Sequence, residues 1–192
     1  MKLFNPILCV LFITVFTLFT SCREVVVEYD CGVVETEMAE LNASVGKYID
    51  SIFTNDISTN FEEAAIAIYV DGTTIITETE TSCFSFTADP QLIEKVKITS
   101  SESVTTGGLT FAADTDLIEL FEVHTIEGLF SISEFIMKQN DLPQIFHIEG
   151  DKLILQLLNK PDVAIDQSFI FELTFDDAKT LDIEIPSFIV SN

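Results

Sequence analysis

Apolar and polar residues alternate along much of this chain, and this period of two is the sequence feature that most constrains its fold. In the run 169–175 apolar residues occupy every second position, and the run 181–185 repeats the pattern. Successive side chains of a β-strand point to opposite faces of its sheet, so the alternation is typical of strands with one buried face. The short turn 176–180 between the runs predicts an antiparallel hairpin. Pro186 ends this ladder or marks a sheet edge, because proline has no N–H to donate.

Further short strands are predicted along the body of the chain. We expect them at 25–29, 64–70, 73–81, 83–86, 95–99, 144–149 and 152–158. Asp71-Gly72 is typical of a type I′ turn and predicts a hairpin between the second and third of these strands. Residues 100–113, with Gly107-Gly108, are predicted to form a loop. Residues 36–63 are ambiguous, because apolar residues fall at helical spacing in a segment that also contains Gly46.

Two short helices are expected within this β pattern. Asp116–Glu119 and Ser131–Glu134 both match the capping box, in which two side chains satisfy backbone N–H groups at the start of a helix. We therefore place helices near 117–123 and 133–139. About eight short strands with helices only in the connections predict a mainly β fold: an antiparallel β-sandwich of immunoglobulin-like type with one to three short helices. An α+β domain is the alternative.

The N-terminus carries the pattern of an export signal. Lys2 precedes an apolar run over 7–19, which is shorter than the ~20 residues that a membrane-spanning helix needs. Thr20-Ser21-Cys22 resembles the lipobox of bacterial lipoproteins, in which the signal is cut before the cysteine and that residue is acylated. We expect residues 1–21 to be a cleaved signal peptide and residues 22–192 a single lipid-anchored domain. Plain secretion and a retained membrane anchor are the alternatives.

The chain is strongly acidic. It has 32 Asp and Glu against 9 Lys and Arg, a net charge of −23. Removal of the signal takes away Lys2 and no acid, so the mature chain has a charge of −24. Nucleic-acid affinity rests on neutralising phosphates with Lys and Arg, so this charge excludes DNA and RNA as partners. It favours solubility, or attraction to cations and basic partners.

Cys31 and Cys83 are the cysteines that remain once Cys9 leaves with the signal and Cys22 is acylated. Two thiols in an oxidising compartment usually pair, so we expect a Cys31–Cys83 disulfide. A bridge of this loop length stabilises a protein by about 4 kcal/mol in the chain-entropy model. Two free thiols, or a metal or redox pair, are the alternatives, and no CxxC spacing supports the last.

Few residues offer a candidate chemical site. Asp114, Asp116 and Glu119 provide oxygen ligands of the kind that calcium prefers, but their spacing departs from the EF-hand loop. Capping of a helix explains the same acids. Neither His124 nor His147 belongs to a recognisable catalytic triad. We therefore expect no metal, no cofactor and no catalytic residue, with the three acids as a weak calcium candidate.

A family resemblance extends over most of the mature chain. The lipobox and the residues around Cys83, Pro90, 96–100 and 117–121 resemble outer-membrane lipoproteins of the Bacteroidota that carry a domain of unknown function. The resemblance implies a cell-envelope setting, and lipoproteins of that phylum often accompany glycan-uptake machinery. Asp50-Ser51-Ile52 resembles the short O-glycosylation site of the same phylum, which makes Ser51 a candidate for glycosylation.

The sequence thus predicts a non-enzymatic, lipid-anchored protein of the outer membrane, facing the periplasm or the cell surface, with a binding or structural role. Its partners would be the membrane, through the lipid, and an envelope protein or glycan. An accessory glycan- or nutrient-binding lipoprotein of an uptake system is the first alternative, and an enzyme is the second. Aromatic residues gathered on one exposed face would favour the glycan-binding alternative.

Overall fold

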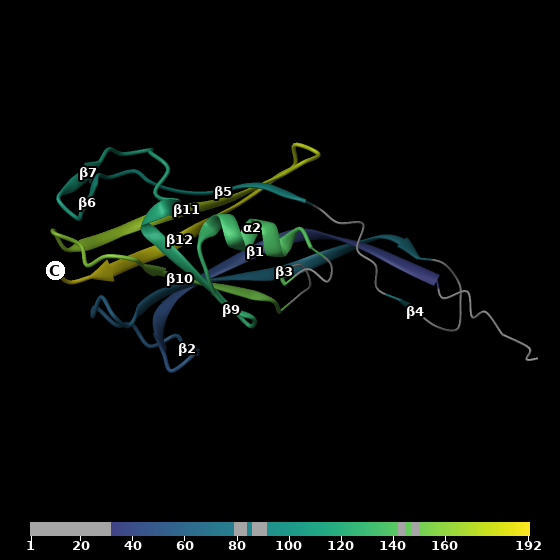
Figure 1. Ribbon diagram of the computed structural model, residues 1–192, viewed down its shortest axis with the longest axis horizontal. Helices are drawn as coiled ribbons and strands as arrows, with labels where there is room; N and C mark the ends of the chain where they lie inside the picture. The colour runs from purple at the N-terminus through teal and green to yellow at the C-terminus, as the bar shows by residue number, and fades with distance from the viewer. Residues whose placement is uncertain (1–31, 79–83, 86–91, 142–144, 147–149) are drawn as a thin grey trace, which may run out of the picture.

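Two largely antiparallel β-sheets lie face to face and form the body of the protein (Figure 1). The computed structural model describes residues 32–78, 84–85, 92–141, 145–146 and 150–192. The larger sheet has the strand order β2-β1-β3-β10-β8-β9, with β4 paired to β1, and the smaller sheet has the order β12-β11-β5. A separate hairpin, β6-β7, lies at the end of the molecule that also holds the C-terminus (Figure 1).

The strands of the larger sheet are β1 (Gly32–Ile49), β2 (Ile52–Thr54), β3 (Ala64–Glu78), β4 (Phe84–Ser85), β8 (Phe121–Thr125), β9 (Gly128–Phe130) and β10 (Lys152–Leu157). Those of the smaller sheet are β5 (Ile93–Ser100), β11 (Ile165–Phe175) and β12 (Thr180–Val190). The remaining elements are β6 (Val104–Thr106), β7 (Leu109–Phe111), the 3₁₀ turn η1 (Ile118–Leu120) and the helix α2 (Ile132–Gln139).

The hydrophobic core fills the space between the two sheets. The inner face of β3 contributes Ile66 and Ile68, and β11 contributes Phe169 and Phe171, all of them essentially inaccessible to solvent. Phe121 of β8 meets Phe169 edge to face across the sandwich, with ring centroids 6.2 Å apart. Such an aromatic pair contributes about 0.5–1.5 kcal/mol beyond the burial of its area. Phenylalanine, which has no polar atom to satisfy, thus provides the largest fully buried side chains of this core, together with many isoleucines.

The helix α2 lies against β5, β8 and β9 and covers the open side of the sandwich (Figure 1). It begins with the capping box predicted from the sequence. The backbone N–H of Glu134 donates to Oγ of Ser131, and the backbone N–H of Ser131 donates to Oε2 of Glu134, 2.9 Å away. The helix predicted at 133–139 is therefore confirmed.

Two amide side chains at the end of α2 hold neighbouring backbone. Gln139 donates from Nε2 to the carbonyl oxygen of Phe146 at 2.7 Å and accepts from its N–H at 2.8 Å. Asn140 makes the same pair of bonds with Ile93 of β5, at 3.1 and 2.8 Å. Each amide side chain thus satisfies both backbone groups of one residue. At Ile93 it takes the place of a neighbouring strand on β5, the edge strand of the smaller sheet.

The clearest sequence predictions are confirmed. β11 and β12 pair as the alternating runs predict, with Phe171 opposite Ile183 and the turn at 176–179. β5 covers the strand expected at 95–99, and β10 covers the strand expected at 152–158 except its last residue. Pro186 lies on β12, the edge strand of the smaller sheet, and pairing continues beyond it, so it marks an edge. The mainly β antiparallel sandwich with short helices is confirmed, and its immunoglobulin-like subtype stays a prediction.

The hairpin predicted at Asp71-Gly72 is wrong. β3 runs straight through this pair, and Gly72 lies opposite Glu40 of β1. Two register shifts on either side of the Glu40–Gly72 pair, one skipping Ala39 on β1 and one skipping Asp71 on β3, absorb the irregularity as bulges. The long pairing with β1 therefore overrides the local turn preference.

The helix predicted at 117–123 is also wrong beyond its first turn. Oδ1 of Asp116 accepts from the N–H of Ile118 at 3.2 Å, but the N-cap of η1 is Leu117, which makes no side-chain capping bond, so the capping box predicted at Asp116–Glu119 is wrong. The helix stops as η1. Phe121 and Val123 then alternate into the core as part of β8, with 2% and 0% of their surfaces exposed. Burial of two side chains on one face of a strand outweighs the capping signal.

The predicted loop and the ambiguous segment both contain strands. The loop predicted at 100–113 contains the hairpin β6–β7, whose turn is Gly107-Gly108 with φ angles of +59° and +75°. These are the positive angles of a type I′ turn, which glycine adopts without strain. The ambiguous segment 36–63 forms most of β1 and all of β2, followed by a turn region up to residue 63, and contains no helix.

Several predictions lie outside the described residues. These are the lipidated Cys22, both partners of the Cys31–Cys83 disulfide, the strand at 25–29, and all of the strand at 144–149 except Ile145 and Phe146, which form no strand. No helix in the described part of the chain is long and apolar enough to cross a membrane.

Candidate functional site

The outer face of the larger sheet, turned away from the core, holds a trough of small residues. Ser44 and Gly46 of β1 lie opposite Ala67 and Ala65 of β3 in the strand register. Side chains alternate between the faces of a strand, so these four residues share the face opposite to Ile66 and Ile68. A sheet whose side chains are this small leaves room for other groups to lie close to its backbone.

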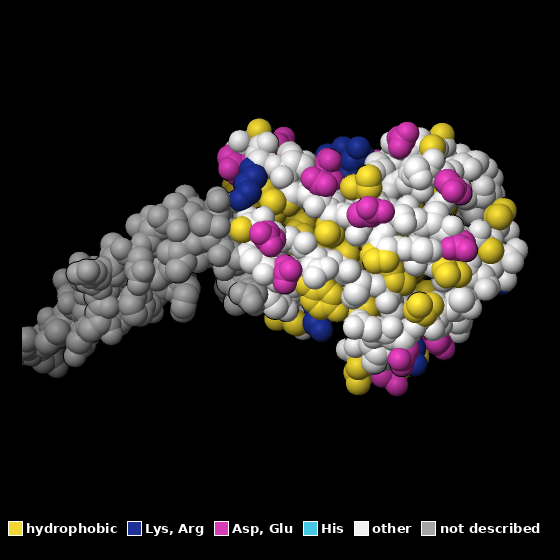
Figure 2. All heavy atoms as spheres, turned by 180° about the vertical axis from the view of Figure 1, so that it is seen from behind, with side chains coloured by type: hydrophobic (Ala, Val, Ile, Leu, Met, Phe, Trp, Pro, Cys, Tyr) yellow, Lys and Arg dark blue, Asp and Glu magenta, His cyan; other side chains and the backbone are white. Residues whose placement is uncertain are grey.

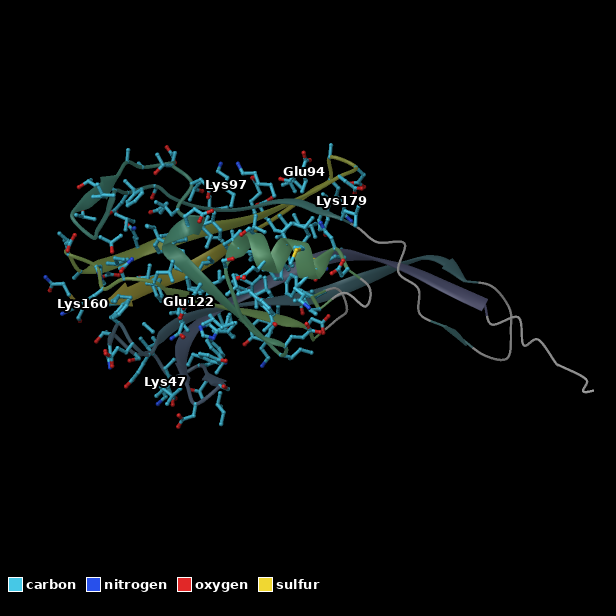
Figure 3. The ribbon with its side chains drawn as sticks, in the orientation of Figure 1. Lys47, Glu94, Lys97, Glu122, Lys160 and Lys179 are labelled. Atoms are coloured by element: carbon cyan, nitrogen blue, oxygen red, sulfur yellow. The ribbon has the colours of Figure 1, made fainter. Side chains whose placement is uncertain are left out.

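The hairpin of β1 and β2 folds over this trough. Tyr48 and Phe53, which are cross-strand partners in the hairpin, pack with Tyr69 against Ala65, Ala67 and Ile154. The hairpin lies at the lower edge of Figure 3, where Lys47 is labelled. It gives the outer face an aromatic layer of its own, separate from the main core.

Gly46 permits the close approach of this hairpin. A Cβ atom at this position would overlap the carbonyl oxygen of Thr54 and would lie 2.9 Å from Cζ of Phe53. Any other residue would therefore push β2 away from the sheet. The tip of the hairpin has Asp50 and Ser51 at φ angles of +50° and +64°, the left-handed conformation of a tight two-residue turn.

His124 of β8 faces the hairpin from the opposite side of the trough. Its ring lies over that of Tyr48, with centroids 4.8 Å apart and planes inclined at 59°. Its Nε2 lies 3.1 Å from Oε1 of Glu122, which accepts a hydrogen bond when that nitrogen carries a proton. The carboxylate thus orients the imidazole ring, and the imidazole supports the tyrosine ring.

Lys152 and Tyr69 form a second pair on the same face. The Nζ of Lys152 lies 5.7 Å from the centroid of the Tyr69 ring, within the range of a cation–π contact. The Oγ of Ser44 donates a hydrogen bond to Oη of Tyr69 at 3.4 Å. The Lys152 side chain is exposed, so its charge remains open to solvent and to a ligand.

Between the β1–β2 hairpin and the β8–β9 hairpin lies a groove of about 550 Å³, which we call the outer groove. It is lined by Tyr48, Ser51, Phe53, His124, Thr125, Ile126, Glu127, Gly128, Leu129, Lys152 and Ile154. Ile126 and Leu129 stand at its mouth with 85% and 56% of their surfaces exposed. Aromatic and aliphatic walls with a few polar groups are typical of small-ligand sites.

The weak calcium candidates do not form a site. Asp116 is engaged with backbone, since its Oδ1 also accepts from the N–H of Ile98 at 3.3 Å, and its Oδ2 lies 3.7 Å from Nζ of Lys95. Asp114 and Glu119 are exposed. Within the described ranges, no three His, Cys, Asp or Glu side chains gather as a metal would need.

Ser51 is exposed at the tip of the β1–β2 hairpin, and its glycosylation stays a prediction. The sequence does not single out Tyr48, Phe53 or Lys152 for the groove, and it names His124 only as an unsupported catalytic histidine. The sequence offers only a weak signal for this site: His124 lies next to the buried Val123 near the end of β8, at an outward-facing position of the strand.

No protein-family model matches the chain, and comparison with curated proteins and with solved structures gives no match either.

Proposed function

We propose that this protein is a non-enzymatic, lipid-anchored component of the cell envelope that binds a ligand in the outer groove. The single observation that carries the binding role is the groove itself, formed by Tyr48 and Phe53 on one side and by His124 and Leu129 on the other. The anchor rests on the lipobox ending at Cys22 and on the resemblance to Bacteroidota lipoproteins. Acylation with two or more chains holds a protein stably on a membrane.

The size and preorganisation of the groove support a binding role. Its volume of about 550 Å³ falls within the ~300–1,000 Å³ of typical small-ligand sites. Tyr48 is held by the sheet beneath it and by His124, and His124 is held by Glu122. Side chains that are fixed before binding lose little conformational entropy when a ligand arrives, which improves affinity.

The non-enzymatic part of the proposal rests on the surroundings of His124. Its imidazole is bonded to Glu122 and packs against the ring of Tyr48, and no hydroxyl nucleophile in the described part of the chain is hydrogen-bonded to it. A histidine that activates a serine needs that hydrogen bond, with a third group behind it. Here the imidazole has a structural task, the support of an aromatic ring.

A glycan is the second, more specific candidate, and the aromatic layer of the groove favours it. Tyr48 and Phe53 offer ring faces or edges to the apolar side of a sugar, while Ser51, Thr125 and Lys152 offer hydrogen-bonding groups around them. The overall charge of −23 favours a neutral sugar over an anionic one. Under this proposal the protein is an accessory glycan- or nutrient-binding lipoprotein of an uptake system.

Calorimetric titration of the mature chain with neutral gluco-, manno- and xylo-oligosaccharides tests the glycan candidate. We expect one class to bind, and we expect Tyr48→Leu and Ile126→Ser each to weaken that binding by about tenfold, or about 1.4 kcal/mol. Val163→Ser is the matched control for Ile126→Ser, because Val163 is a β-branched residue with 61% of its surface exposed outside the groove. Absence of binding to all three classes would contradict the glycan candidate, and equal loss in the control would contradict the groove.

A further inference from the structure

A second, smaller pocket lies on the other side of β9. It has a volume of about 310 Å³ and is bounded by η1, the β8–β9 hairpin, the start of α2 and the residue after β10. Its apolar lining includes the buried Phe121 and Ile132. Leu129 and Leu158 also line it, with 56% and 49% of their surfaces exposed. We call it the glutamate-rimmed pocket.

Three carboxylates line this pocket: Glu119 of η1, Glu122 of β8 and Glu134 of α2. No lysine or arginine lines it, and none of the three carboxylates forms an ion pair with a lysine among the described residues. Lys160 is the first lysine after Leu158 in the sequence. In Figure 3 its side chain extends from the left-hand end of the molecule, away from Glu122. Glu122 is bonded to His124, so Glu119 and Glu134 are the two rim carboxylates that form no ion pair among the described residues, and they place negative charge beside an apolar centre.

The charge of the whole molecule has the same sign as the rim. The net charge is −23, and Figure 2 shows carboxylates spread over the back face with few lysines among them. A molecule with this charge attracts a basic partner and repels an acidic surface. Two copies of the chain, each with this charge, repel one another, which disfavours self-association through the pocket.

Hydrogen bonds hold the walls of the pocket in place before any partner arrives. The N–H of Leu158 donates to the carbonyl oxygen of Leu120 at 2.8 Å, which fixes one wall. Glu134 is fixed by the capping box with Ser131, and these hydrogen bonds also lower its pKa, so its carboxylate stays charged at neutral pH. The pocket, with its exposed leucine walls, is therefore already formed in the protein without a partner.

We propose that the glutamate-rimmed pocket docks a basic amphipathic segment of a partner protein. One leucine, isoleucine or phenylalanine side chain of that segment enters between Leu129 and Leu158, and flanking lysines or arginines face Glu119 and Glu134. The apolar contact supplies affinity, and the charge pairs supply orientation and rate of encounter. This site is separate from the ligand site of the outer groove, although Leu129 lies on the wall between them.

Fluorescence anisotropy with three short labelled peptides tests the proposal on the full mature chain. The first peptide has one leucine between lysines, the second replaces the leucine with serine, and the third replaces the lysines with glutamates. We expect only the first to bind, and we expect high salt to weaken it, because exposed charge pairs are screened.

Two variants and a matched control locate the site. The double variant Glu119→Gln with Glu134→Gln should weaken binding of the lysine peptide by about tenfold, since each exposed ion pair contributes up to about 1 kcal/mol. Glutamine is also tolerated in a capping box, so α2 is preserved. Leu158→Ser should weaken binding by a similar factor. The control, Glu94→Gln with Glu184→Gln, makes the same change of charge on β5 and β12 and should change binding less than twofold.

Four outcomes would overturn the proposal. They are no binding of the lysine peptide, equal binding of the serine peptide, equal loss in the control variant, and a dimer of the chain that Leu158→Ser dissociates. The last would identify a second copy as the occupant. Tight binding of the first peptide that both pocket variants weaken, and the control does not, would support it.

Discussion

Gln139 is the polar side chain whose replacement we expect to lower the free energy of unfolding strongly. It is 1% exposed, and its amide group forms two hydrogen bonds with the backbone of Phe146, at 2.7 and 2.8 Å. Phe146 itself is fully buried in the core. The two bonds join the end of α2 to the segment that carries this aromatic ring.

Replacement of Gln139 with methionine removes both hydrogen bonds and nearly preserves the volume. The N–H and the carbonyl oxygen of Phe146 are then left without this partner, and each unsatisfied buried group costs about 1–3 kcal/mol. We therefore expect Gln139→Met to lower the free energy of unfolding by about 2–6 kcal/mol. Gln139→Ala should cost more, because it also leaves a cavity. Such a loss is a large part of the ~5–15 kcal/mol that stabilises an ordinary domain.

Urea denaturation followed by far-UV circular dichroism measures these differences, since the chain has no tryptophan to report unfolding. Met137→Ala is the control on the same helix, because the Met137 side chain is 59% exposed and should contribute less than about 0.5 kcal/mol. The reasoning fails if Gln139→Met unfolds within 1 kcal/mol of the wild type, roughly the lower limit for a single unsatisfied group.

Three further predictions follow from individual contacts. Gly46→Ala should lower the free energy of unfolding by about 1–3 kcal/mol through overlap with Thr54, and it should also weaken the binding of any ligand in the outer groove. An unchanged thermal unfolding curve would contradict the close approach of β2. The pKa of Glu134 lies below its usual 4.5, chiefly because the carboxylate accepts a hydrogen bond from the backbone N–H of Ser131. This bond therefore stabilises the fold fully above pH 4.5, and the stabilisation should be lost as the pH falls through the lowered pKa. Unfolding of wild type and Glu134→Gln against pH should show their difference shrinking below pH 4.5, whereas a constant difference would contradict the charged interaction. The residues after Cys31 and Cys83 are paired in the β1–β4 ladder, so alkylation without reductant should find both thiols blocked, and Cys83→Ser should cost up to about 4 kcal/mol. Alkylation of both cysteines in the native protein would exclude the bridge.

The parts of the fold that the sequence predicts are those that a local pattern determines. Phe169–Phe175 has an apolar residue at every second position, and one face of such a strand must be buried, so its hairpin with β12 follows without knowledge of the rest. The capping box at Ser131 is equally local. Asp71-Gly72 misleads because the choice between turn and strand depends on the long pairing with β1, which no window of sequence contains.

The candidate site is harder to predict, because it depends on contacts across several strands. Tyr48 reaches His124 only because the trough beneath the hairpin is made of small residues in register and Gly46 permits the close approach of β2. Each of these residues is ordinary in its own segment. The sequence could state that aromatic residues on one face would favour glycan binding, but it could not state that Tyr48 and Phe53 would share that face.

The most direct test of the central proposal is metabolic labelling of the native host with an alkyne-bearing fatty acid, followed by purification of the protein and mass spectrometry of its N-terminus. We predict a labelled chain that begins at an acylated Cys22, partitions into detergent, and loses both the label and the partitioning in Cys22→Ala. An unlabelled chain that retains residues 1–21, or that stays wholly in the aqueous phase, would contradict the lipid anchor and with it the assignment to the cell envelope.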